Sequence, residues 1–417
     1  MDRLLAVLSA WLLAAPSLAQ APPPDLASFL RLLDEGHPRL RGDEARIRAS
    51  EARIAPMQAL PDPEMRLAYT NEGLQEITFG DSVDANLTLT YEQEVPYRGK
   101  RRLSGEVASA EVDVARSELE LDRRALREQV ILAYVDILRA DRTRRIVEAS
   151  REVLNTLLAS ARARYEAGQG VLEDLLKTQT EITRIEVETA DLDQERAEAE
   201  SRLNVAVGRA PATPIPPLSV LPELALPDAG EALAAASSSP SLERMRRMEA
   251  VSAARLESAR LARKPDWLWG VSWAERGSID PMVMGMVGAR LPLWRKNKQL
   301  QEAAAAESDL AAVRAAREAE NLSLAGEISE MLARAARAGR RLEILEQALI
   351  PQARSTLEAG SASYANGRTV FISLLDDALD LLAFERDLER QRADLGAALA
   401  GIEARTGLQL VRTGRQP

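Results

Sequence analysis

Two spacings of hydrophobic positions occur along this chain. Long segments place apolar residues three and four positions apart, which is typical of a helix with one buried face. From position 103 to position 165 there is no proline and a single glycine, Gly105. At about 1.5 Å per residue, a helix of this length would extend roughly 95 Å, far beyond the size of a compact domain.

The last third of the chain carries the pattern of a coiled coil. Ten positions between 371 and 402, separated alternately by three and four residues, lie on one helix face, and eight of them are apolar. These eight are Phe371, Leu374, Ala378, Leu381, Leu388, Leu395, Leu399 and Ile402. Such a seam predicts that this helix packs lengthwise against another helix.

Strand-like alternation at every second position occurs in four shorter segments: 65–70, 85–95, 267–273 and 283–291. In the second, Leu87, Leu89 and Tyr91 share one face, while the residues between them are polar. Three of the five tryptophans share one face of the third segment. Turn-rich connections join the segments in pairs, which predicts β-hairpins at about 63–95 and about 266–292.

The second half of the chain repeats the first. The stretch YEAGQGVLEDLL, from Tyr165, returns 199 residues later as YANGRTVFISLL, with five identities in register. EVPYRGKR at Glu94 is echoed by RLPLWRKN at Arg290, 196 residues later. A looser echo is a helix flanked by prolines, Pro38 and Pro61 in the first half and Pro240 and Pro265 in the second. Three echoes in one order indicate duplication.

The repeats define the domain organisation. We expect a first repeat at 20–208 and a second at 239–404, each with a helix, a hairpin, a very long helix, a Tyr-x-x-Gly break and another long helix. The tips of the long helical hairpins are expected near 168–170 and 367–369. Between the repeats, the segment 209–238 begins with six prolines in nineteen residues, which predicts a linker. Residues 405–417 form a C-terminal tail.

The N-terminus resembles a secretory signal peptide over residues 1–19. Arg3 is followed by an apolar run, Pro16, and the small-x-small pattern Ser17-Leu18-Ala19 before Gln20. The apolar run has about 12 residues, whereas a helix that spans a membrane needs about 20.

Composition excludes several functions. Acidic residues outnumber basic ones 64 to 54, which argues against nucleic acid as a partner. There is no cysteine and a single histidine, His37, so thiolate metal sites, disulfides and a cysteine nucleophile are excluded. No Ser/His/Asp set, phosphate loop or paired-carboxylate site has supporting context, so we expect no catalytic residues and no cofactor.

Two further features have ordinary explanations. Met282, Met284 and Met286 lie on one strand face, and thioethers can bind Cu(I), but such stripes are more often plain sheet surface, so we expect no metal site. The basic runs 98–102 and 295–298 lie at the ends of hairpins and are interpreted as the edge of a membrane zone rather than a nucleic-acid patch.

The hairpins are open to two interpretations. A soluble sheet would explain the alternation, but a secreted chain with three tryptophans on one strand face favours a membrane interface. Strands in lipid cannot leave open edges, and four strands are fewer than the eight of the smallest known barrel. A membrane barrel would therefore be shared between chains.

The signal peptide, the duplicated layout and the paired Tyr-x-x-Gly breaks together resemble the TolC-like outer membrane factors, which are exit ducts of Gram-negative tripartite efflux and type I secretion systems. The stretch EQEVPYRGKR is most similar to the members that serve heavy-metal and RND-type pumps. The resemblance implies a mainly α fold with a small β part. It also implies a homotrimer, in which four transmembrane strands per chain build a 12-stranded β-barrel and long coiled-coil hairpins continue it for about 100 Å.

The resemblance also implies where partners bind. A periplasmic adaptor protein is expected to dock at the helix tips, formed by Tyr165, Gly168, Gln169, Gly170, Val171, Tyr364, Gly367, Arg368, Thr369 and Val370. The glycines fit the family pattern, whereas the residues that flank them are less apolar than in the family. An inner-membrane pump, of RND type, and outer-membrane lipid are the other expected partners.

An acidic ring that narrows the periplasmic end is implied at Asp174, Ser373, Asp376 and Asp377. One of the family's paired aspartates is replaced here by Ser373. Carboxylates around a narrow aperture attract cations. An alternative is that these acids only stabilise the positive ends of their helices.

Taken together, these features predict a passive, non-enzymatic channel in the outer membrane of a Gram-negative bacterium, with a long periplasmic extension. The alternative is a secreted periplasmic coiled-coil structural or adaptor protein without a membrane barrel.

Overall fold

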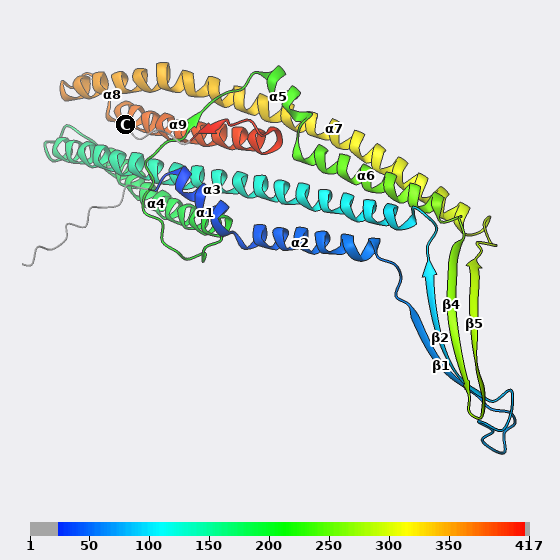
Figure 1. Ribbon diagram of the computed structural model, residues 1–417. Coiled ribbons are helices and arrows are strands. Elements are labelled where there is room, and N and C mark those ends of the chain that lie inside the picture. The colour runs from blue at the N-terminus through cyan, green and yellow to red at the C-terminus, as the bar shows by residue number, and fades with distance from the viewer. Residues whose placement is uncertain (1–23, 413–417) are drawn as a thin grey trace, which may run out of the picture.

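The computed structural model of the chain describes residues 24–412. The predicted signal peptide and the last five residues of the tail lie outside the described residues. The molecule is elongated, with a β-sheet at one end and the two reversals of the long helices at the other (Figure 1). This shape follows from helices too long to fold back within one globular core.

Nine α-helices make up most of the described chain: α1 (Leu26–Gly36), α2 (Pro38–Gln58), α3 (Lys100–Glu166), α4 (Leu172–Ala206), α5 (Ala229–Ala236), α6 (Pro240–Leu261), α7 (Gln299–Ile344), α8 (Ile350–Ala365) and α9 (Phe371–Thr406). Helix α3 has 67 residues, which corresponds to about 100 Å. Prolines open α2 and α6 at their first position, where a missing amide hydrogen costs nothing.

The second very long helix is not continuous. A π-helical turn, Leu345–Leu349, separates α7 from α8 immediately before Pro351. Proline cannot donate a hydrogen bond to the preceding turn, and its ring crowds the carbonyl there, so the backbone widens locally. The first repeat has no proline within α3 and no interruption.

Four antiparallel strands form the sheet in the order β1 (Glu64–Thr70), β2 (Asn86–Val95), β4 (Asp266–Arg276) and β5 (Ile279–Arg290). The two hairpins are neighbours through β2 and β4, and β1 and β5 are the free edges. A second pair, β3 (Glu223–Leu224) with β6 (Val411–Arg412), was not predicted, because two residues are too few to show a period.

The register gives the sheet two different faces. Leu89 lies opposite both Leu67 and Trp273, so the alternating apolar positions of neighbouring strands share one face. That face is solvent-exposed in the single chain: Met65, Leu67, Tyr69, Leu87, Leu89, Trp267, Trp269, Val271, Trp273, Val283 and Val287. The other face carries the polar residues of β1 and β2 and the methionines of β5, which lie opposite Gly270, Ser272 and Ala274.

Two apolar cores lie in the helical part. One is at mid-length, where α1, α5 and the proline-rich linker pack on α3, α4, α7 and α9. The other lies near the reversals, between α3, α4, α8 and α9. Six of the eight seam residues predicted on α9 are buried, while Leu381 and Leu388 are only partly buried.

The linker is held to the helices by a buried carboxylate. Asp141 of α3 accepts hydrogen bonds from the Leu218 backbone N–H (2.8 Å) and from Arg196 Nε of α4 (2.6 Å). Arg196 also donates to the Ile215 carbonyl, at 3.0 Å. Because both partners of this ion pair are hydrogen-bonded to the linker backbone, the linker crosses α3 and α4 at a defined place.

Candidate functional site

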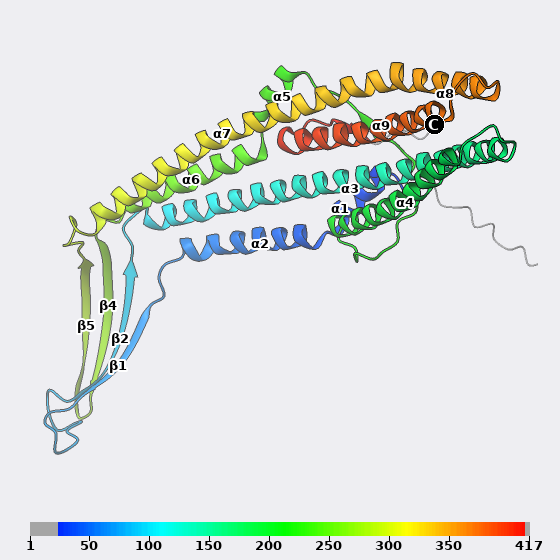
Figure 2. The same ribbon diagram turned by 180° about the vertical axis from the view of Figure 1, so that it is seen from behind.

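The two reversals of the long helices lie at the same end of the molecule, opposite the sheet (Figure 2). Two residues beyond the end of α3 and of α8 lies a glycine in the left-handed region, Gly168 with φ 71° and Gly367 with φ 69°. The following amides bond back to the last turn, Gln169 N–H to the Arg164 carbonyl and Arg368 N–H to the Ser363 carbonyl, both at 2.9 Å. The Tyr-x-x-Gly breaks are therefore two copies of one helix-ending motif.

The second glycine of the first break has a different function from the first. Gly170 has a negative φ, but a Cβ on it would lie 3.1 Å from the Tyr165 backbone nitrogen. The chain passes so close to the end of α3 that a side chain there would need the neighbours to move. Gly170 thus allows close approach, while Gly168 provides the turn.

The two tyrosines of the breaks are not equivalent in the structure. Tyr165 is exposed, whereas Tyr364 is buried and its ring makes an edge contact with Phe371, with the ring centroids 5.6 Å apart. Arg164 of α3 lies over the Tyr364 ring, 4.4 Å from its centroid, and donates to the Tyr364 carbonyl at 3.2 Å. Tyr364 therefore supports the reversals from within and presents little surface to a partner.

Arg164 joins the two reversals, and sequence reasoning missed it. A basic residue in the last turn of a helix is normally explained by the helix dipole. Its contact with a residue 200 positions away becomes visible only once both hairpins are placed. Arg164 thus belongs to the candidate site.

The outer surface of the reversals combines exposed apolar and polar groups. Val171 and Val370 are 57% and 64% exposed, and Gln169 and Arg368 beside them are exposed as well. Thr369 is partly buried. Because an aliphatic side chain at each tip lies open to solvent, the tips offer a surface that a partner protein can cover.

Asp174 and Ser373 lie on the first turns of α4 and α9, and Asp376 and Asp377 lie on the second turn of α9; the four do not form one cluster within the chain. Asp376 lines a groove of about 550 Å³ between α4 and α9, together with Glu173, Lys177 and several leucines. Asp377 lies against Gly360 of α8 instead. Asp174 is partly buried and Ser373 is exposed.

Burial and nearby charge raise the pKa of two of these acids. Burial, and then the nearby Glu173 carboxylate, raises the pKa of Asp174 above its ordinary value. Burial, and then Asp380 and Asp376, raises the pKa of Asp377. Lys177 makes an ion pair with Glu173 at 2.7 Å. The first two turns of α4 and α9 therefore gather several carboxylates, and Lys177 pairs with one of them.

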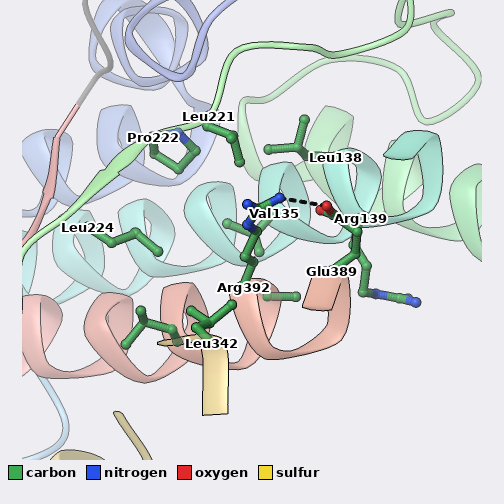
Figure 3. Close-up of a pocket in the computed structure, with 11 residues that line it drawn as sticks. Val135, Leu138, Arg139, Leu221, Pro222, Leu224, Leu342, Glu389 and Arg392 are labelled. Atoms are coloured by element: carbon green, nitrogen blue, oxygen red, sulfur yellow. Dashed lines mark hydrogen bonds and ion pairs between the residues drawn. The ribbon is translucent and has the colours of Figure 1, made fainter. Parts of the chain in front are cut away.

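A second concavity lies at mid-length and contains none of the residues predicted from the sequence. It has a volume of about 240 Å³ and is lined mainly by apolar side chains of α3, α9 and the linker, including Val135, Leu138, Leu221 and Leu224. Figure 3 shows the ion pair between Glu389 and Arg392, two of its lining residues, which are 2.6 Å apart. Among residues 24–412, no group of three or more His, Asp or Glu side chains is arranged to hold a metal ion.

Comparison with known proteins gives this arrangement a family context. Residues 30–209, nearly all of the first repeat, match the outer membrane efflux protein family. Among curated protein sequences, no significant match was found. Within the part of the chain that the structure describes, no helix has an apolar stretch long enough to cross a membrane.

Solved structures match almost the whole chain. The outer membrane protein VceC from Vibrio cholerae aligns over 92% of this chain and 96% of its own, with a TM-score of 0.76 and 17% identity. CusC aligns over 94% and 95%, with a TM-score of 0.79 and 14% identity. The open-state MtrE outer membrane channel of Neisseria gonorrhoeae aligns over 94% and 91%, with a TM-score of 0.76 and 17% identity.

The chain has the fold of the outer membrane efflux channels. The resemblance predicted from the sequence is thereby confirmed, in sequence for the first repeat and in fold for both repeats. In this channel fold, the sheet and the two reversals are the opposite ends of a single elongated protomer (Figure 1).

Proposed function

We propose that the protein is the outer-membrane exit duct of a tripartite efflux system, which conducts substrates passively from an inner-membrane pump to the exterior. The observation that carries this proposal is the channel fold over more than nine-tenths of the chain, together with the outer membrane efflux match of the first repeat. The similar proteins are channels rather than enzymes, which fits a protein without a catalytic function.

The sheet supports a membrane location. Its one face is covered with exposed leucine, valine, methionine and aromatic side chains, as a lipid-facing surface requires. Its other face carries Asn86, Thr88, Thr90 and Glu92 on β2, which suits a water-filled lumen. The tryptophans of β4 lie on the apolar face, where indole groups favour the membrane interface.

The open edges of the sheet support a trimer. Strands β1 and β5 each have one side without a hydrogen-bonding neighbour, and such edges are not stable in lipid. The strands alternate in direction, so β5 of one copy can pair with β1 of the next in the same antiparallel manner. Three copies of the four-stranded sheet close into a barrel of 12 strands.

The helical part then extends into the periplasm. With the sheet in the outer membrane of a Gram-negative bacterium, the reversals lie about 100 Å away, on the side of the pump. We place adaptor docking at the exposed tip residues around Gln169, Val171, Arg368 and Val370. An adaptor protein and an inner-membrane pump of RND type complete the proposed system.

The acids near the starts of α4 and α9 are proposed to line the narrow end of the duct. Three copies would bring several carboxylates together, which favours entry and retention of cations. Replacing Asp174 and Asp376 with Ala is expected to raise conductance in planar bilayers or to weaken block by divalent cations. Unchanged conductance and block would place the aperture elsewhere.

The decisive experiment on the function is localisation together with assembly. We expect the protein in the outer-membrane fraction, as a trimer in unboiled gel samples that becomes a monomer on heating, and as a conducting pore in planar bilayers. A monomer in the soluble periplasmic fraction would contradict the proposal and favour the coiled-coil structural or adaptor protein.

A further inference from the structure

The duplicated chain has two junctions at which a strand leads into a long helix, and within the described residues only the first has its lysine paired with an aspartate. At the first junction, Lys100 Nζ lies 2.8 Å from both carboxylate oxygens of Asp266. The Tyr97 backbone N–H also donates to Asp266, at 2.7 Å. Lys100 and Asp266 are only 20% and 17% exposed. This ion pair therefore fastens the start of α3 to the foot of β4.

Both partners of this ion pair have counterparts in the other repeat. Lys296 corresponds to Lys100 in the match between EVPYRGKR and RLPLWRKN. Asp62 corresponds to Asp266, because each directly follows the proline in the short connection between the matching helix and strand. Asp62 and Lys296 are both exposed, and neither makes an ion pair within residues 24–412. Asp62 and Lys296 are thus opposite charges that have no ion-pair partner within the described residues.

The topology explains why these two charges do not meet. Asp62 precedes β1 and Lys296 follows β5, and these strands are the opposite edges of the sheet. Within the chain, the first ion pair forms because β4 lies beside β2. If β1 of a second copy lies beside β5, Asp62 of that copy reaches the position relative to Lys296 that Asp266 has relative to Lys100.

Apolar side chains at the same level give a second, independent indication. Leu293 and Trp294, at the foot of β5, are each 76% exposed. At the other edge, Met57 and Leu60 are 53% and 42% exposed. Leu261 is the counterpart of Met57, because each lies four residues before the matching proline. In the first junction, Leu261 lies against Gly99. The second junction thus has an uncovered apolar surface on each side of the missing contact.

We propose that a second copy of this chain fills the second junction, with Lys296 paired to Asp62 of the neighbouring copy and Leu293 and Trp294 packed against its Met57 and Leu60. The proposal rests on the trimeric barrel described above and names the contact that joins its protomers at the inner edge of the membrane.

The two junctions differ in backbone detail. Gly99 has a φ of 100°, a conformation that Arg295 at the matching position does not readily adopt. The second junction accordingly forms a turn over residues 293–298 before α7 begins. The two junctions are therefore equivalent in the elements and charges that they bring together and not in the path of the backbone. The long side chain of Lys296 compensates for the different backbone path.

Chemical cross-linking tests the contact directly, since the chain has no cysteine of its own. In the variant Asp62→Cys/Lys296→Cys, a bifunctional thiol reagent of about 10 Å reach is preferable to direct disulfide formation, which needs Cα atoms within about 7 Å. We expect a covalent trimer that survives boiling. The matched variant Lys100→Cys/Asp266→Cys should instead give an internally linked monomer.

The negative control is Asp62→Cys/Asp280→Cys, because Asp280 lies at the far end of β5. No covalent oligomer is expected from it. A preparation that is trimeric before boiling but yields no covalent trimer from the Asp62/Lys296 variant overturns the contact and leaves the proposed channel intact. Absence of any trimer in the unmodified protein overturns both.

Charge exchange separates a neighbouring copy from a lipid headgroup as the partner of Lys296. Lys296→Asp and Asp62→Lys should each lower the temperature at which the trimer dissociates, and the combined exchange should restore it. Asp81→Lys, the same charge change in the loop at the far end of the first hairpin, should have no effect. A different result would show that Lys296 binds lipid and would refute the contact: Lys296→Asp alone lowers the dissociation temperature, Asp62→Lys leaves it unchanged, and the combined exchange does not restore it.

Discussion

The contact of Arg164 with Tyr364 predicts how firmly the two helix reversals are held together. The guanidinium lies 4.4 Å from the ring centroid, a geometry that contributes about 0.5 to 2 kcal/mol, depending on exposure. Its hydrogen bond to the Tyr364 carbonyl, at 3.2 Å, adds about 1.5 kcal/mol, the lower end for a charged donor. Removing the side chain should therefore cost the tip about 2 to 3.5 kcal/mol.

Hydrogen exchange in the assembled protein measures this cost locally. Since about 1.4 kcal/mol corresponds to a factor of ten, Arg164→Ala should speed exchange of the tip amides, residues 364–371, roughly 30- to 300-fold. Arg162→Ala is the matched control, because its ion pair with Glu166 is 71% and 65% exposed and is worth at most about 0.5 kcal/mol.

A double-mutant cycle with Tyr364→Leu isolates the interaction of the guanidinium with the ring from the cavity that the smaller side chain leaves. We expect a coupling energy of about 0.5 to 2 kcal/mol. Equal exchange rates in the Arg164→Ala and Arg162→Ala proteins, or a coupling energy near zero, would refute the reasoning.

Three further predictions concern the glycine of the first reversal, the apolar face of the sheet and Asp174. Gly168→Ala should destabilise the tip by about 1 kcal/mol, because φ is 71° there. Gly326→Ala, within α7 and with open space around it, should stabilise the protein by about the same amount. The temperature of thermal dissociation should therefore fall in the first variant and rise in the second. Leu89→Arg on the apolar sheet face should cost about 2 to 4 kcal/mol of membrane stability and Thr88→Arg on the polar face far less, measured as the fraction inserted into vesicles. Burial raises the pKa of Asp174 in the folded chain above its ordinary value, so the protonated side chain stabilises the fold at low pH, and this contribution is lost as the pH rises through the folded pKa. Asp174→Asn should therefore make the tip more stable at neutral pH and weaken the response of the tip to acidification. An unchanged pH profile of hydrogen exchange at the tip would contradict this.

Features that depend on neighbouring residues could be predicted from the sequence. The apolar spacing of three and four predicts the long helices, and alternation predicts the four strands of the main sheet. Gly168 and Gly367 mark the reversals, because a left-handed backbone at the end of a helix strongly favours glycine. Two local features differ from the prediction: Pro351 accounts for the break between α7 and α8, and the alanine-rich end of the predicted linker forms α5.

Features that depend on distant residues could not be predicted in this way. Tyr165 and Tyr364 occupy the same place in two matching motifs, yet only Tyr364 is buried, because Arg164 and Phe371 cover it. Asp376 and Asp377 are adjacent in sequence but lie toward different neighbours, the groove beside α4 and the surface of α8. Such outcomes depend on which way each helix faces, and that depends on all the helices packed around it.

The sequence by itself determined that the chain is duplicated and which segments are helices, strands and reversals, since periodicity and glycine chemistry are local. That matching residues of the two repeats contact different neighbours follows only from the tertiary structure. Lys100 finds Asp266 because β4 lies beside β2, while their counterparts Lys296 and Asp62 lie at the two open edges of the sheet. The physical reason is that a sheet of four strands in one chain has two ends, so equal sequences at its middle and at its edges meet different neighbours.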